Sequence, residues 1–358
     1  MAGLLYREDM DDVRQRLTAW WQGGDIGRPA LAVTAPRARP IEEIPALPEP
    51  PGWVTDYSTS NFEYRVNLAA RACIDRYYLG EAVPYVAPDL GPNCLALYLG
   101  ATGVEMPGTV WFRPCIEDPE QTRFAVDEDN FYWRYTLRLT EAFSRVGRGK
   151  FLLQFPDLIE GLDTLAGLRG TERLLIDLVE RPAWVQCSLR QITTLYFYYY
   201  EALYARIHDE VGGSVFWMWA PGRLAKLQCD FSAMISPAMF GEFMVPVLRE
   251  MCARIPYTIY HWDGPGAIPH HDHLLSIPEL KVIQWTAGAG AEPGAHPRWW
   301  PLYHKTVDAG KGMYVLAESV DDLIALRREF GQKLKRFYIA LSVSSLAEAE
   351  RALATVSD

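Results

Sequence analysis

Four of the seven histidines and two aspartates occur within 13 residues, from His261 to His273. His261 and Asp263 end an apolar run, and the run Gly264-Pro-Gly266 that follows is typical of a strand end. Side chains two residues apart on a regular strand point to the same side. This imidazole and carboxylate can therefore hold a metal ion or act as an acid–base pair. The structural alternative is that Asp263 caps the turn and His261 is a hydrogen-bonded core residue.

A second pair of reactive side chains ends another apolar run. Asp230 follows the run, at the end of a predicted strand. Cys229 offers a soft ligand, although free cysteines are more often small buried hydrophobic residues. We predict His261, Asp263 and Asp230 as catalytic residues. We predict His261, Asp263 and Cys229 as ligands of a divalent metal.

Substrate contacts are expected from further residues near strand ends. Gln284 can hydrogen-bond an amide or a carboxylate, and a tryptophan can face a flat or cationic group. The predicted substrate-binding residues are Asp157, Glu160, Trp219, His270, Gln284 and Trp285. Each has a structural alternative, because most aromatic residues fill cores and polar residues are common where helices begin.

The elements that would position these groups follow a βα pattern. Residues 8–22 form a predicted amphipathic helix that ends at Gly23-Gly24, within an N-terminal helical extension over residues 1–27. Beyond residue 150, short apolar strands alternate with helices, which is typical of a parallel sheet whose ligands bind at the carboxyl ends of the strands. Without repeats or linker composition, we predict a single α/β domain over residues 1–358.

Composition limits the classes of partner. The net charge of −10 and the pI near 5.3, without a basic stripe, exclude a nucleic-acid partner. No apolar run approaches the roughly 18 residues of a membrane span, so we expect no membrane association. The six cysteines lack Cys-x-x-Cys spacing, which indicates reduced thiols and a cytoplasmic location. The composition is compatible with a monomer or a homodimer.

Three segments together resemble one protein family. Leu158–Glu172 resembles a helix after the fourth strand, and Cys229–Phe243 resembles an acid followed by an Ile-Ser-Pro helix start. His261-Trp-Asp-Gly264 stands where a His-x-Cys-Gly turn is found. The family is the uroporphyrinogen decarboxylase superfamily, which includes the corrinoid-linked methyltransferases. The resemblance covers residues 150–350 well and the N-terminal third weakly.

This resemblance implies a single (β/α)8 TIM-type barrel whose site lies at the carboxyl face of the strands. It also implies either decarboxylation or methyl transfer, the latter with a divalent metal such as zinc. Two features depart from the family. Asp263 stands where the family has its first zinc-binding cysteine. The last strand region, Ala340–Ser344, contains no cysteine, although the family has its second zinc-binding cysteine there. The segment Arg28–Arg37 does not reproduce the arginine-rich stretch that binds porphyrin carboxylates, so uroporphyrinogen is not the expected substrate.

The leading hypothesis is a methyltransferase that moves a methyl group from a small methylated substrate to a corrinoid protein or a similar acceptor. The chain has no corrinoid-binding Asp-x-His-x-x-Gly segment, so the corrinoid would be supplied by a partner protein. One alternative is a lyase that decarboxylates a small acid, with Asp230 or Asp263 as proton donor. The other is a non-catalytic protein that binds a small molecule in an aromatic pocket.

Overall fold

The main sheet carries six parallel strands. The structure, a computed structural model, describes residues 3–51 and 57–357. The sheet has the order β2-β1-β13-β12-β11-β10-β9, in which only β2 runs antiparallel to its neighbour. Its strands are β1 (Ala30–Pro36), β2 (Arg76–Gly80), β9 (Leu224–Gln228), β10 (Tyr257–Asp263), β11 (Val282–Thr286), β12 (Gly312–Ala317) and β13 (Phe337–Ser342). Long buried apolar stretches in these strands are what a parallel sheet covered on both faces requires.

Six shorter strands lie outside this sheet. They are β3 (Tyr85–Val86), β4 (Thr102–Met106), β5 (Thr109–Arg113), β6 (Leu152–Leu153), β7 (Ser214–Phe216) and β8 (Met218–Ala220). The β4–β5 and β7–β8 pairs are antiparallel, whereas β3–β6 is parallel, and a parallel bridge from Gln154 to Val215 connects β6 to β7. The sequence predicts a strand that gives way to a loop over 83–92, and the structure has only the two-residue β3 there. It also predicts one strand over 150–157 and one over 212–221, where the structure has the two-residue β6 and the β7–β8 hairpin.

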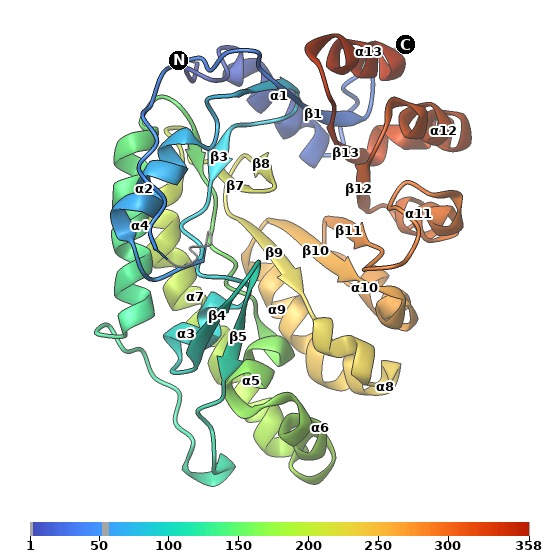
Figure 1. The fold of residues 1–358 in the computed structure, drawn as a ribbon. Coiled ribbons are helices and arrows are strands. Elements are labelled where there is room, and N and C mark those ends of the chain that lie inside the picture. Colours follow the sequence, from blue (N-terminus) through green and yellow to red (C-terminus); the bar gives the residue numbers. More distant parts are fainter. Residues whose placement is uncertain (1–2, 52–56, 358) are drawn as a thin grey trace.

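Helices cover the outer side of the strands. They are α1 (Met10–Trp21), α2 (Phe62–Arg71), α3 (Cys94–Tyr98), α4 (Phe131–Gly147), α5 (Gly161–Arg169), α6 (Thr171–Glu180), α7 (Pro182–Ile207), α8 (Pro237–Met239), α9 (Val245–Arg254), α10 (His271–Leu275), α11 (Trp300–Asp308), α12 (Val320–Phe330) and α13 (Leu346–Val356). Helices α10 to α13 follow one another along strands β10 to β13, and α13 lies beside β1 (Figure 1). Among the described helices, none is long and apolar enough to cross a bilayer.

The first and last parallel strands are neighbours, as β1 pairs with β13. This order confirms an α/β fold with a central parallel sheet. The ladders of the described strands do not form one continuous ring, because β3 and β6 pair separately from the seven-stranded sheet. The predicted helix in the N-terminal extension is present as α1, and it packs into the body of the protein: the Trp21 indole donates to the Trp219 carbonyl over 3.0 Å.

Candidate functional site

One row of side chains crosses six neighbouring strands on the same face of the sheet. Residues that are direct partners in parallel strands point the same way. The row consists of Gln228, His261, Gln284, Tyr314, Tyr338 and Ala30. The alternation along each strand then places Asp263 on this face too, and Trp262 and Trp285 on the opposite face.

Asp230, His261 and Asp263 form a compact group at the carboxyl ends of β9 and β10. Each offers one nitrogen or oxygen atom, and these atoms all lie within 4.8 Å of one another. Asp230 is exposed, whereas His261 and Asp263 are partly buried. Gly264, at a φ of +76°, lets the chain turn directly after Asp263, and its N–H donates to the Thr286 carbonyl over 2.9 Å. The structure thus brings together the three residues predicted as catalytic.

Asp163, at the start of α5, holds the loop that carries Asp230. Its carboxylate accepts from the backbone N–H groups of Asp230 and Phe231, each over 2.8 Å. The Gln228 amide donates to the Asp230 carboxylate over 3.0 Å and reaches Asp163 over 3.4 Å. Because both backbone and side chain are tied, Asp230 is held in one position beside the histidine.

Gln284 orients the imidazole of His261. Its amide nitrogen donates to the Trp285 carbonyl and to the Thr286 hydroxyl, each over 2.9 Å. Its carbonyl oxygen therefore faces His261 Nδ1, with which it forms a short hydrogen bond. An amide oxygen only accepts, so Nδ1 carries the proton and Nε2 keeps its lone pair.

The charges around this group shift the pKa values of its members. Although part of Asp230 reaches the surface, desolvation of its carboxyl group and the nearby carboxylate of Asp163 raise the pKa of Asp230 to about 6. Burial, followed by the ammonium of Lys226, lowers the pKa of His261. The imidazole is therefore neutral near pH 7, as a metal ligand or a general base must be.

The three side chains fit a divalent cation. Carboxylate oxygen and imidazole nitrogen suit zinc, manganese or iron, and three protein ligands leave coordination positions for a substrate. Asp263 Oδ1 is buried without a hydrogen-bond partner among the described residues. A bound cation would satisfy this oxygen, whose burial alone is costly. The donor set thus matches a catalytic rather than a structural metal site.

Neither the protein-family models nor the curated proteins searched include a match to this chain. Among solved structures, a methyltransferase from Methanosarcina mazei is similar over 94% of each chain, with a TM-score of 0.58 and 13% sequence identity. The likeness is one of fold. At this identity it gives the chain a methyltransferase-like architecture and assigns no activity.

Asp157 and Glu160, predicted to bind substrate, instead surround a buried lysine. Lys226 forms an ion pair with Asp157 over 2.5 Å and donates a short hydrogen bond to the side-chain amide oxygen of Gln228. Glu160 is fully buried and accepts from the Gln228 N–H over 3.1 Å; burial raises its pKa well above the usual range. Of these two acids, only Asp157 has partial solvent exposure, at 17% of its side chain.

Cys229 is not part of the group of three donors. Cys229 follows the last residue of β9 and is 3% exposed, and burial raises the pKa of its thiol well above the usual range. The structure therefore places Asp230, and not Cys229, beside His261 and Asp263.

Three predicted substrate contacts face the packed interior instead. Trp219 is 1% exposed, and its indole donates to Asp209 over 2.8 Å. Trp285 packs edge-on against Trp262, with centroids 4.8 Å apart, on the helix-covered face. His270 Nε2 contacts the Ser232 carbonyl at 2.9 Å, and its ring stacks on Phe240. These residues complete the core and do not join the group.

Trp217, which the sequence did not single out, does face the group. It lies at the turn of the β7–β8 hairpin with a φ of +59°, and its backbone N–H donates to the side-chain amide oxygen of Gln154 over 2.7 Å. Its ring lies edge-on to His261, with centroids 5.4 Å apart, and near Tyr314, at 6.1 Å. A non-glycine residue held at positive φ next to reactive groups is a common sign of a functional position.

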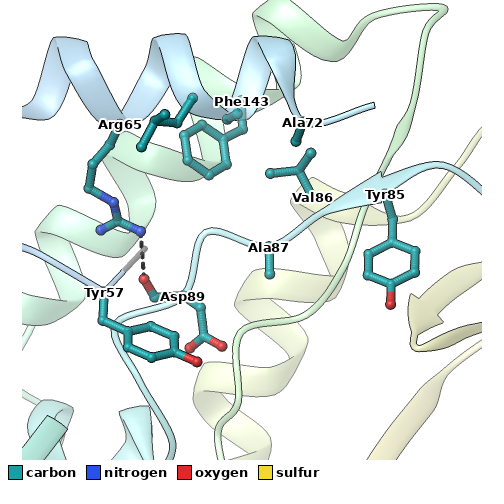
Figure 2. A pocket seen from close by; sticks show the side chains of 10 residues that line it. Tyr57, Arg65, Ala72, Tyr85, Val86, Ala87, Asp89 and Phe143 are labelled. Carbon is teal, nitrogen blue, oxygen red and sulfur yellow. Dashed lines mark hydrogen bonds between the residues drawn. The ribbon is translucent and has the colours of Figure 1, made fainter. Parts of the chain in front are cut away.

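Two cavities lie near the N-terminal part of the chain. The larger, of about 530 Å³, contains Trp217 and Tyr314 in its wall; we call it the aromatic cavity. The smaller, of about 270 Å³, is lined in part by Arg65 and Asp89; we call it the Asp89 cavity (Figure 2). Ala72 and Tyr85 line both. The aromatic cavity is thus one tryptophan ring away from His261.

Proposed function

We propose that this chain is an enzyme that transfers a methyl group from a small methylated substrate to a corrinoid protein or a similar acceptor. Asp230, His261 and Asp263 would hold a divalent metal such as zinc. The observation that carries the proposal is the convergence of their three donor atoms within 4.8 Å, at the carboxyl ends of parallel strands. The methyltransferase-like fold adds support.

A divalent metal bound here would act as a Lewis acid on the heteroatom that carries the methyl group. The chain itself positions its donors through Gln284, Gln228 and Asp163. In the reaction the carbon–heteroatom bond breaks and both electrons stay on the heteroatom. A reduced corrinoid held by a partner protein would supply the electron pair that accepts the methyl carbon. The leaving heteroatom would take a proton from solvent, because Asp230 would be a deprotonated ligand of the metal.

We further infer that β3 and β6 complete an eight-stranded barrel with the six parallel strands of the main sheet, within one domain, and that the β7–β8 hairpin connects β6 to β9. The parallel pairing of β3 with β6 and the bridge from Gln154 to Val215 continue the strand order toward β9. A closed ring would make the row through His261 an interior row, and would direct the partner protein to the open carboxyl face.

A decarboxylase is the second candidate, and one observation favours it. Asp230 has a raised pKa of about 6, so a substantial fraction of its carboxyl groups carries a proton at mildly acidic pH. A protonated acid can supply the proton that replaces carbon dioxide on the product. In that reaction Asp230 would be the donor, and no metal would be needed.

Metal content and methyl transfer together test the proposal. Protein purified without chelator should contain about one equivalent of a divalent metal, and Asp263→Asn should lower its affinity at least tenfold. With added cob(I)alamin and a panel of methylated ethers, thiols and amines, the wild type should form methylcobalamin, followed by absorbance. Asp272→Asn is the matched control, because Asp272 is exposed and pairs with Lys305 on the surface.

Equal metal affinity in Asp263→Asn and the wild type would refute the metal site. Release of carbon dioxide from a carboxylic acid by metal-free protein, lost in Asp230→Asn, would replace methyl transfer with the lyase. If neither reaction occurs while the metal is bound as expected, the methyl-transfer proposal fails and the metal site stands.

A further inference from the structure

The aromatic cavity has the shape and chemistry of a slot for a flat ring. Its walls include Tyr78, Tyr85, Trp217, Tyr314 and Tyr338. Tyr314 and Tyr338 meet edge to face with centroids 4.8 Å apart, and Trp217 is perpendicular to Tyr314 at 89°. Aromatic rings prefer such offset and edge-to-face partners. A planar ligand can therefore pack against aromatic rings that face the cavity from more than one direction.

Small side chains on β1 and β13 make the room for this ligand. Ala32 pairs with Ala340, and both line the cavity, so the alanines leave space where larger residues would fill it. Just above them the hydroxyls of Thr34 and Ser342 lie 2.8 Å apart at the exposed rim. The floor is apolar and the rim can form hydrogen bonds, which is the usual build of a small-molecule site.

The charge at the rim is positive. Among the described residues that line the cavity, Arg76 is the only one with a charged side chain. Arg76 is exposed and makes no salt bridge with the described residues. An arginine with free donors is suited to a carboxylate or another planar anion. This cavity therefore favours an anionic over a cationic ligand.

The neighbouring Asp89 cavity has charges of both signs in its lining, from Arg65 and Asp89. Figure 2 shows the Asp89 side chain directed toward the ring of Tyr57, and burial together with Asp157 raises the pKa of Asp89 to about 6. Arg65 also lines this cavity, so the positive guanidinium offsets the negative charge that Asp89 carries when it is ionised. The two cavities share Ala72 and Tyr85, but among the described lining residues only the Arg76 side has a positive charge without a carboxylate, which favours that side for an anionic group.

We propose that the aromatic cavity binds the ring of an aromatic carboxylate, with the ring against Trp217 and Tyr314 and the carboxylate at Arg76. If the proposed function holds, this ligand is the methyl donor, an aryl methyl ether that carries an acid group. Tyr314 is two strands from His261, about 10 Å along the sheet. Trp217 lies between them, so a ring substituent opposite the carboxylate would point toward the three metal-binding residues.

The test measures binding, without turnover or corrinoid. Full-length protein is titrated calorimetrically with 4-methoxybenzoate, with cyclohexanecarboxylate as the saturated anion and with benzyltrimethylammonium as the aromatic cation. We expect 4-methoxybenzoate to bind at least tenfold more tightly than either. Trp217→Leu should weaken it about tenfold and Arg76→Gln about fivefold, because a ring contact and a charged hydrogen bond are lost.

Matched controls are Trp111→Leu and Arg328→Gln, since Trp111 is 65% exposed on β5 and Arg328 is exposed on α12. Both should bind like the wild type. Ala340→Phe fills the cavity without removing an aromatic wall, and it should abolish binding even if Trp217→Leu does not fold. Equal affinity for the saturated acid or the cation, or unchanged binding in Ala340→Phe, would overturn the proposal.

Failure of this inference and failure of the proposed function are distinguishable. Loss of the metal in Asp263→Asn should leave 4-methoxybenzoate affinity within about threefold of the wild type. Methyl transfer from a non-aromatic donor, without binding of the aryl acid, would refute the ligand class and keep the methyltransferase. Binding of the aryl acid without methyl transfer would refute the methyltransferase and keep the ligand class.

Discussion

In the proposed metal site, replacing Gln284 should weaken metal binding although the glutamine is not one of the proposed ligands. Its amide nitrogen is committed to the Trp285 carbonyl and the Thr286 hydroxyl, so its oxygen has only the His261 ring to accept from. In Gln284→Leu the Nδ1–H of His261 loses its acceptor. The ring is then free to rotate and to place its proton on Nε2, the atom needed for the metal.

The expected effect follows from two independent magnitudes. An unpaired, partly buried N–H costs about 1–3 kcal/mol. Removing the hydrogen-bond partner of a metal-binding histidine typically lowers metal affinity about 10- to 100-fold, which equals about 1.4–2.7 kcal/mol. Both ranges agree. We therefore expect the dissociation constant for zinc or manganese to rise about 10- to 100-fold in Gln284→Leu.

Isothermal titration of metal-free protein with zinc and with manganese measures this constant. Gln284→Glu keeps an acceptor at the same place, so it should retain affinity within about threefold or increase it. Gln191→Leu is the control for a glutamine-to-leucine change, because Gln191 is exposed on α7. Unchanged affinity in Gln284→Leu, with the fold intact by circular dichroism, would refute the orienting role.

Two further predictions concern stability. His271 is buried against Thr306, and burial, followed by Lys305, lowers its pKa to about 4, below the unfolded value near 6.5. The unfolded state therefore binds more protons between these values, and stability should fall by on the order of 1–2 kcal/mol from pH 7.5 to pH 5. This loss should be reduced in His271→Gln, by urea unfolding. Glu81 is fully buried between Arg16 and Arg28, so Glu81→Gln should cost about 3–5 kcal/mol in thermal or urea unfolding, whereas exposed Glu279→Gln should not.

The central group of the candidate site could be predicted because it depends on strand periodicity. His261 and Asp263 are separated by one residue on a strand whose ends are marked by apolar residues and by Gly264. Asp230 lies two residues beyond the end of the preceding strand, and parallel neighbours bring such ends together. The same rule accounts for Gln284, which pairs with His261 directly. Because neighbouring residues of a strand point to opposite faces, the position of Trp285 next to Gln284, and of Cys229 next to Gln228, already argues against both as site residues.

The tryptophan prediction failed because a hairpin reversed the chain where one strand was expected. A continuous strand over 212–221 would put Trp217 and Trp219 on the same face. The positive φ of Trp217 instead turns the chain there, and Trp219 returns toward α1 and Asp209. No local pattern marks this turn, since glycine or asparagine is the usual residue at such a φ. Its cause is tertiary: the Trp217 N–H binds Gln154 on the adjacent strand.

Asp163 shows why contacts around the central group are harder to read from sequence than the group itself. It lies in the first turn of α5, where an acid is expected on helix-dipole grounds alone. Its actual partners are two backbone N–H groups of the loop after β9, 67 and 68 residues away in the chain. A carboxylate that accepts two N–H groups fixes the loop, and its negative charge keeps Asp230 partly protonated near pH 6. Asp163→Asn should therefore both loosen the loop and lower the pKa of Asp230, two effects that Asp163→Glu would separate by restoring charge without the same reach.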